Sequence, residues 1–141
     1  WKGLKELSNT QKFPAVPRLH CIQPKVCMPI VAAFRNESWN PSSQGITTVA
    51  GGIAVEKPPR EHQLLSALAD THGHAIAVEE QEIIEWQKLL AQQEGLFVEL
   101  TSAAVLAGLS NLMKAGQVKC QDSVLVPLTG FGFKDRIPRE D

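Results

Sequence analysis

Apolar residues along the chain follow two different spacings. A spacing of three and four positions, typical of one helix face, occurs in the segments 1–7, 27–34, 61–71, 79–94 and 103–114. Short apolar runs, typical of strands, occur between them at 19–23, 74–78, 96–98 and 123–128. Helices that alternate with strands predict an α/β domain of three layers (α/β/α), in which helices cover both faces of a mostly parallel sheet.

The two most apolar of these runs are expected to lie in the core. Residues 123–128 (SVLVPL) form a nearly continuous apolar stretch, a pattern shown by strands that are buried on both faces in parallel sheets. Residues 96–98 (LFV) are the second such run. We therefore expect the core to include Leu96, Phe97, Val98, Val124, Leu125 and Val126.

Three loops carry residues that suit a ligand. Adjacent glycines at 51–52 interrupt a strand-like run, which indicates a bulge, a close approach of the backbone to a ligand, or a flexible turn. The turn 99–102 precedes a helix rich in small residues and suits polar or anionic groups, with Thr101 or Ser102 as the expected N-cap. The turn 129–132 follows the carboxyl end of an apolar strand, where open α/β sheets bind ligands.

Length and charge narrow the possible functions. The chain has 141 residues, of which 43% are hydrophobic, and this suits one globular domain. Its 14 basic and 15 acidic residues give a net charge of −1, so no nucleic-acid partner is expected. No apolar run approaches the roughly 18 residues that span a bilayer, so no membrane association is expected either. These observations favour a soluble domain with a small-molecule site.

The cysteines and histidines do not predict a metal site. Cys21, Cys27 and Cys120 cannot all pair within one chain and lack zinc-binding spacing, so we expect buried thiols in a reducing cytosol. His72 and His74 have no third ligand nearby in the sequence, which favours a solvated turn.

Several segments resemble sequence blocks of threonine synthases, which are pyridoxal-phosphate enzymes of fold type II (the tryptophan synthase β-like superfamily). Residues 95–104 (GLFVELTSAA) with 106–109 (LAGL) are similar to the block EGIFVEP-SAA-LAGL, and 126–135 (VPLTGFGFKD) to LTGHGLKD. Further matches are residues 48–53 (TVAGGI) with TxAxGI, 77–83 (AVEEQEI) with AVSDEEI, and 23–34 (QPKVCMPIVAAF) with QAEGCAPIVRAF. The matches follow one another in order over nearly the whole chain.

The resemblance implies that residues 1–141 are the C-terminal portion of the catalytic domain of a longer enzyme. In the family, the phosphate-binding loop directly precedes a WKG helix start, which residues 1–3 resemble, and the Schiff-base lysine lies further upstream. No catalytic residue is therefore expected in this chain, and the chain alone is expected to be inactive. The implied cofactor is pyridoxal 5′-phosphate, and the implied reaction converts O-phosphohomoserine to threonine and phosphate. The implied enzyme is a cytoplasmic homodimer that acts on a small amino-acid substrate.

The resemblance also implies roles for five residues. Thr129 resembles the hydroxyl residue that meets the pyridine nitrogen, Gly130 would keep the following turn tight, and Gly52 would let the backbone approach the cofactor ring. Glu99 resembles the acidic residue at the edge of the site, and Ser102 would lie on the substrate side. For Thr129 the alternative is a strand-end threonine that bonds to the backbone, for Glu99 an ordinary turn carboxylate, and for Ser102 an N-cap serine.

Four positions depart from the family pattern. Leu100 replaces a proline, Phe131 a histidine, Glu79 a capping serine, and Gly51 a larger residue. Phe131 places an apolar ring beside the turn, where the family has a polar one, so the resemblance does not identify the substrate. A threonine/serine dehydratase and a cysteate synthase-like lyase are therefore alternatives within the superfamily. A non-catalytic α/β binding module is the alternative outside the enzymes.

Overall fold

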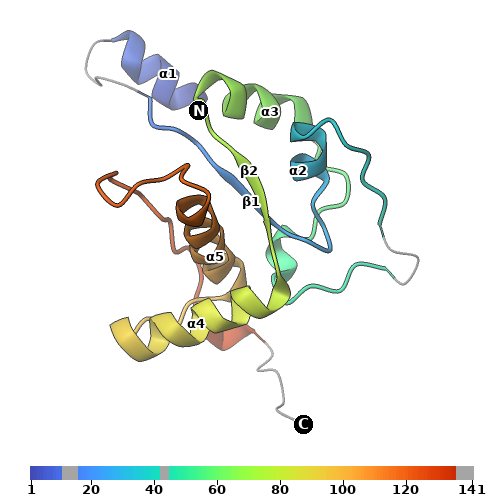
Figure 1. Ribbon diagram of the computed structural model, residues 1–141, viewed down its shortest axis with the longest axis vertical. Helices are drawn as coiled ribbons and strands as arrows, with labels where there is room; N and C mark the ends of the chain where they lie inside the picture. The colour runs from blue at the N-terminus through green and yellow to red at the C-terminus, as the bar shows by residue number, and fades with distance from the viewer. Residues whose placement is uncertain (11–15, 42–44, 136–141) are drawn as a thin grey trace.

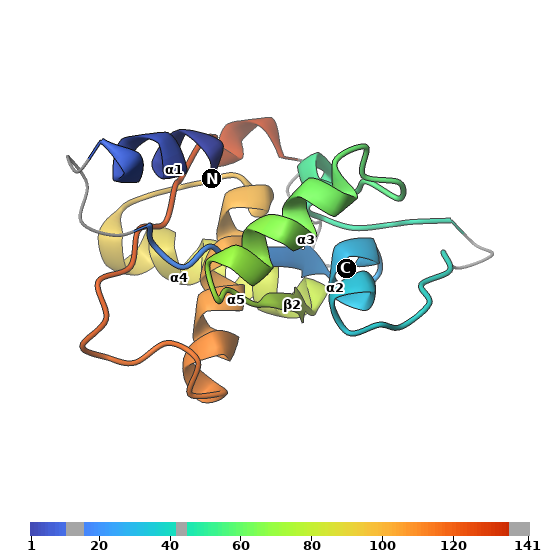
Figure 2. The same cartoon turned by 90° about the horizontal axis from the view of Figure 1, so that it is seen from above.

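The computed structural model describes residues 1–10, 16–41 and 45–135. The helices and strands, in chain order, are α1 (Lys2–Asn9), β1 (Cys21–Pro24), α2 (Pro29–Phe34), the 3-10 helix η1 (Gly51–Ile53), α3 (Glu61–Asp70), β2 (Ala75–Val78), α4 (Glu80–Glu94), α5 (Leu100–Lys114) and the 3-10 helix η2 (Gly132–Lys134). The five predicted helices form, and the predicted strands at 19–23 and 74–78 form as β1 and β2, whereas no strand separates α4 from α5 (Figure 1). Helix α1 lies at the periphery and contributes no buried residue (Figure 2).

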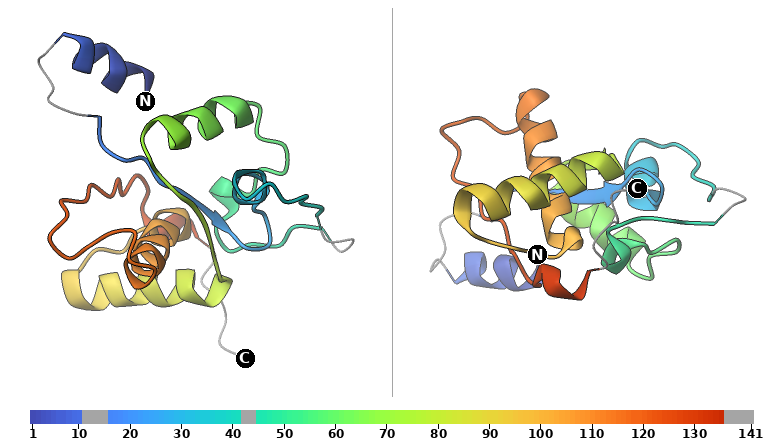
Figure 3. Two further views of the ribbon diagram at one scale, coloured as in Figure 1. Left: turned by 45° about the horizontal axis from the view of Figure 1, so that its top comes forward. Right: turned by 90° about the horizontal axis from the view of Figure 1, so that it is seen from below.

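The strands β1 and β2 form a parallel pair in which Cys21 faces Ala75 and Pro24 faces Val78. Successive residues of a strand point to opposite faces, and the two faces of this pair are covered by different helices. Helices α2 and α3 bury one face at Ala75, and α4 and α5 bury the other at Val78 (Figure 3). The expected three-layer α/β arrangement with a parallel sheet is confirmed.

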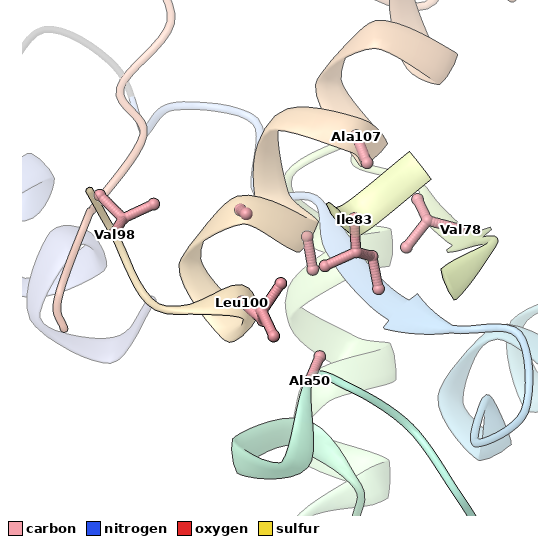
Figure 4. Close-up of a cluster of buried hydrophobic side chains, with 8 residues drawn as sticks. Ala50, Val78, Ile83, Val98, Leu100 and Ala107 are labelled. Atoms are coloured by element: carbon pink, nitrogen blue, oxygen red, sulfur yellow. The ribbon is translucent and has the colours of Figure 1, made fainter. Parts of the chain in front are cut away.

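Helix α5 packs directly against the sheet because its inner face is built of small residues. Ala103, Ala104 and Ala107 are fully buried in the main core cluster (Figure 4). At Gly108 the side chain of Ile22 comes so close that a Cβ would overlap it. The small side chains therefore set the distance between α5 and β1.

The ends of α4 follow from its sequence. The Glu79 N–H donates to Glu82 Oε2 at 2.9 Å, so a glutamate three residues into the helix satisfies the backbone at its start. The helix ends at Gly95, whose φ of 69° is the left-handed conformation that glycine adopts without strain.

The predicted core strands are wrong. Residues 123–129 form no strand, Leu125 is 93% exposed, and Val124 and Leu96 are each 48% exposed. Phe97 and Val126 are half-buried, and Val98 alone of the six is buried. A continuous apolar run indicates burial from both sides, but within the described residues no strand lies beside 123–128 to pair with it.

Three smaller expectations also need correction. The run around the paired glycines forms η1 rather than a strand. Helix α5 begins at Leu100, so Thr101 and Ser102 lie inside its first turn instead of capping it. Cys120 is exposed, although Cys27 is buried as expected.

No helix in the described part of the chain has the length and hydropathy that a membrane crossing requires.

Candidate functional site

The turn 129–132 is fastened to the first turn of α5 by backbone and side-chain hydrogen bonds. The Thr129 N–H donates to Ser102 Oγ at 3.2 Å, and the Glu99 N–H donates to the Gly130 carbonyl at 2.9 Å. The Gly132 N–H donates in turn to the Phe97 carbonyl at 3.0 Å. The fold thus brings together four residues that the sequence singled out as candidates.

The side chain of Glu99 leaves little space beside Gly130. A Cβ on Gly130 would overlap the Glu99 carboxylate, so a larger residue at this point of the turn would require that side chain to move. The residue Glu99 is only 7% exposed, and its carboxylate forms an ion pair with Lys134. The hydrogen bond and the negative charge of Glu99 raise the pKa of Lys134 above its ordinary value. The carboxylate is therefore held by a cation beside the turn that carries Thr129.

Gly52 lies on another side of the same helix turn. A Cβ on Gly52 would come within 2.8 Å of Thr101 Oγ1, so the loop approaches α5 more closely than a larger residue would allow. Ala50, two residues before Gly52 in the chain, is fully buried in the core cluster that includes Leu100 (Figure 4). Residues 101 and 102 thus contact the Gly52 loop and the Thr129 turn, respectively.

The exposed residues of these two segments form the part of the surface that we call the open face. Gly51, Gly52, Thr129 and Phe131 are all exposed. Within residues 1–10, 16–41 and 45–135, the Thr129 hydroxyl has no protein partner, although its N–H is bonded to Ser102. The face offers a ligand a hydroxyl, two glycine backbones and a carboxylate already paired with a cation. The described residues hold no cluster of three metal-ligating side chains.

Two surface hollows lie elsewhere. One lies between α1 and α3 and is lined by Trp1, Lys5 and Asp70, among others. Another lies beside α2 and is lined by Ala33 and Trp39, among others. Neither contains a residue of the candidate site.

The structure adds three residues that the sequence analysis did not select. Lys134 pairs with Glu99, as described above. Asp135 accepts the Leu100 N–H at 2.7 Å and the Gln87 Nε2–H at 3.1 Å on one carboxylate oxygen, so it caps α5 from a distant segment. Lys134 and Asp135 both lie in the segment 126–135 that resembles a family block, and this resemblance is the feature of the sequence that could have identified them. The third is Glu80, whose carboxylate accepts hydrogen bonds from Thr48 and Val49.

Comparison with known proteins relates this sequence to a family. A family model described as pyridoxal-phosphate dependent enzyme matches residues 1–130. Three relatives, each named threonine synthase, are similar to the chain: that of Methanocaldococcus jannaschii is 37% identical over 141 residues, that of Methanosarcina acetivorans 33% over 138, and that of Halalkalibacterium halodurans 32% over 135. Each match covers 96% of this chain but only 34% to 36% of the relative. The chain therefore spans about a third of the length of these relatives.

Proposed function

The chain belongs to the pyridoxal-phosphate-dependent enzymes, and on this basis we propose that it forms the pyridine side of the cofactor site in a threonine synthase. The enzyme would convert O-phosphohomoserine and water to threonine and phosphate. The observation that carries this proposal is the state of Thr129: its backbone is tied to Ser102, while its hydroxyl is exposed and has no partner among the described residues.

The residues of the open face fit the cofactor ring. The Thr129 hydroxyl would hydrogen-bond the pyridine nitrogen, Gly52 would let the loop backbone approach the ring, and Gly130 would leave room for Glu99 beside it. When bound, pyridoxal phosphate supplies an electron sink for reactions at the α-carbon of an amino acid. A neutral hydroxyl holds the ring nitrogen in place without adding charge, and Lys134 balances the charge of Glu99 nearby.

Ser102 contacts the turn that carries Thr129. It is nearly fully buried, and its hydroxyl already accepts the Thr129 N–H. Those contacts support a role in holding the turn that carries Thr129. Direct contact with the substrate stays a prediction.

We further propose that residues 1–141 are the C-terminal portion of a catalytic domain that acts in the cytoplasm as a homodimer. The lysine that binds the cofactor would lie upstream of residue 1, as the resemblance to threonine synthases implies. The matches to relatives about three times as long support the part of this proposal that makes the chain a portion of a longer enzyme.

The test uses the full-length protein that carries this chain. Titration with pyridoxal phosphate should give a visible absorption band, and borohydride reduction followed by peptide mass spectrometry should place the cofactor on a lysine outside residues 1–141. O-phosphohomoserine should then yield equal amounts of threonine and inorganic phosphate. The isolated 141-residue chain should bind the cofactor weakly or not at all.

Other outcomes would contradict the proposal in distinct ways. Release of ammonia and a 2-oxo acid from threonine or serine, without threonine formation, would identify a dehydratase. Failure of the full-length protein to bind pyridoxal phosphate would favour a non-catalytic module.

A further inference from the structure

The carboxylate of Glu80 binds a loop that is distant in sequence. Glu80 is the first residue of α4, and the Thr48 hydroxyl lies 2.8 Å from its Oε1 and 3.0 Å from its Oε2. The Val49 N–H donates to Oε2 at 2.7 Å. Hydrogen bonds to a charged acceptor are stronger than neutral ones, and this carboxylate is partly buried. The start of α4 and the loop before η1 are thereby joined.

The contacts continue from this loop to the candidate site. The Thr48 hydroxyl oxygen also accepts the Ala50 N–H at 3.1 Å, and Ala50 is fully buried in the core. The next two residues, Gly51 and Gly52, form the start of η1 and lie at the open face, where Gly52 contacts Thr101. Displacement of Thr48 would therefore shift the backbone that is proposed to approach the cofactor.

The acidic residues at the start of α4 have different tasks. Glu82 accepts the Glu79 N–H and so satisfies the backbone of the helix itself. Both carboxylate oxygens of Glu80 instead accept hydrogen bonds from the loop. A carboxylate that only stabilised the start of the helix through the helix dipole would not form hydrogen bonds with the Thr48 hydroxyl and the Val49 N–H.

We propose that Glu80 is a positioning residue that fixes the Gly51–Gly52 backbone beside the first turn of α5. The proposal rests on the proposed function, because the position of this backbone matters for cofactor binding only if the face binds pyridoxal phosphate. Glu80 acts through Thr48 and does not itself touch the cofactor.

The experiment compares Glu80→Gln with Glu85→Gln in the full-length protein. Both substitutions remove one negative charge from α4, but Glu85 is exposed, and among the described residues its carboxylate accepts a hydrogen bond only from Gln81 of its own helix. In the cofactor-free protein, hydrogen exchange of the peptide that contains residues 48–53 should accelerate in Glu80→Gln alone. The dissociation constant for pyridoxal phosphate should rise about tenfold in that variant, as expected for a weakened hydrogen bond to a charged acceptor.

Thr48 provides the second pair of variants, in case Glu80→Gln folds poorly. Thr48→Val removes the hydroxyl that contacts Glu80 and should weaken cofactor binding, whereas Thr48→Ser keeps the hydroxyl and should restore the wild-type affinity and absorption band. Unchanged exchange at 48–53 in both Glu80→Gln and Thr48→Val would overturn the anchoring role. Faster exchange with unchanged cofactor affinity would overturn the link to the site. If the wild-type protein bound no cofactor, the proposed function would fail, and the exchange measurements would still decide whether Glu80 holds the loop.

Discussion

At the residue scale, Thr129 has two separable groups. Its N–H donates to Ser102, while its hydroxyl has no partner among the described residues and the residue is exposed. Thr129→Val in the full-length protein nearly keeps the volume but leaves the pyridine nitrogen without a partner, at a cost of roughly 1–3 kcal/mol. We expect the dissociation constant for pyridoxal phosphate to rise at least about fivefold and turnover to fall.

Two companion variants sharpen this test. Thr129→Ser retains the hydroxyl and should behave like the wild type. Thr129→Asp should favour a protonated ring and alter the partition among products. The assignment is wrong if the valine variant binds the cofactor as tightly as the wild type and loses only thermal stability, because a threonine that serves only to hold the backbone would behave in that way.

His20 makes the stability of the chain depend on pH. Burial, and then the positive charges of His74 and Arg18, lower the pKa of His20 below its ordinary value. Its Nδ1 accepts the His74 N–H at 3.2 Å, which requires a neutral ring. The unfolded chain therefore binds a proton near pH 6.5 that the folded chain does not bind, so stability is lost as the pH falls below about 6.5.

Denaturant unfolding at pH 7 and pH 5 checks this prediction. The loss of unfolding free energy between the two values should be smaller in His20→Asn, which keeps an acceptor but does not titrate. His62→Asn, a change at an exposed histidine, should leave the difference unchanged. An equal pH dependence in the wild type and His20→Asn would refute the assignment.

At the element scale, the fit of α5 on β1 depends on the absence of a side chain at Gly108. Gly108→Ala would place a Cβ into the side chain of Ile22 and should destabilise the chain by about 1–3 kcal/mol. Gly3→Ala, in the exposed α1 with open space around it, should instead be neutral or stabilise by up to about 1 kcal/mol. Thermal or denaturant unfolding of both variants measures the contrast.

A double variant identifies the cause. In an Ile22→Ala background the overlapping atoms are gone, so Gly108→Ala should cost markedly less than in the wild type. An undiminished cost would show that Ile22 is not the obstacle.

The elements that the sequence predicts best are those with local signals. Helix α4 has an apolar stripe, acidic residues in its first turn and Gly95 at its end, all within a short stretch of chain. The expected strand at 123–128 has only an apolar run, and a strand also needs a hydrogen-bonded neighbour, which the pattern of one segment cannot reveal. The same limit applies to the site. Thr129, Gly130, Glu99 and Ser102 stand out through their motifs, whereas Glu80 and Asp135 act on residues far along the chain, and only the fold reveals those contacts.

At the scale of the whole molecule, burial is unevenly distributed. The core clusters lie against the two strands, while several large apolar residues of 124–133 are exposed. The pair Leu68→Ala and Leu125→Ala tests this difference in the 141-residue chain. Leu68 is 3% exposed and its truncation should cost about 2–5 kcal/mol, whereas Leu125 is 93% exposed and its truncation should change stability by less than about 0.5 kcal/mol. Equal costs would mean that residues 123–128 are buried after all.

The parallel pairing of β1 with β2 has a consequence for the order of folding. Cys21 meets Ala75, so the pair can close only after α2, η1 and α3 have been looped between them, and such loop closure costs entropy before any contact compensates for it. Helices α4 and α5 are neighbours in the chain and need no such loop, so we expect them to associate early. The glycine loop at 51–52 lies within the crossover. The candidate site should therefore become complete only at the slow step in which the two strands meet.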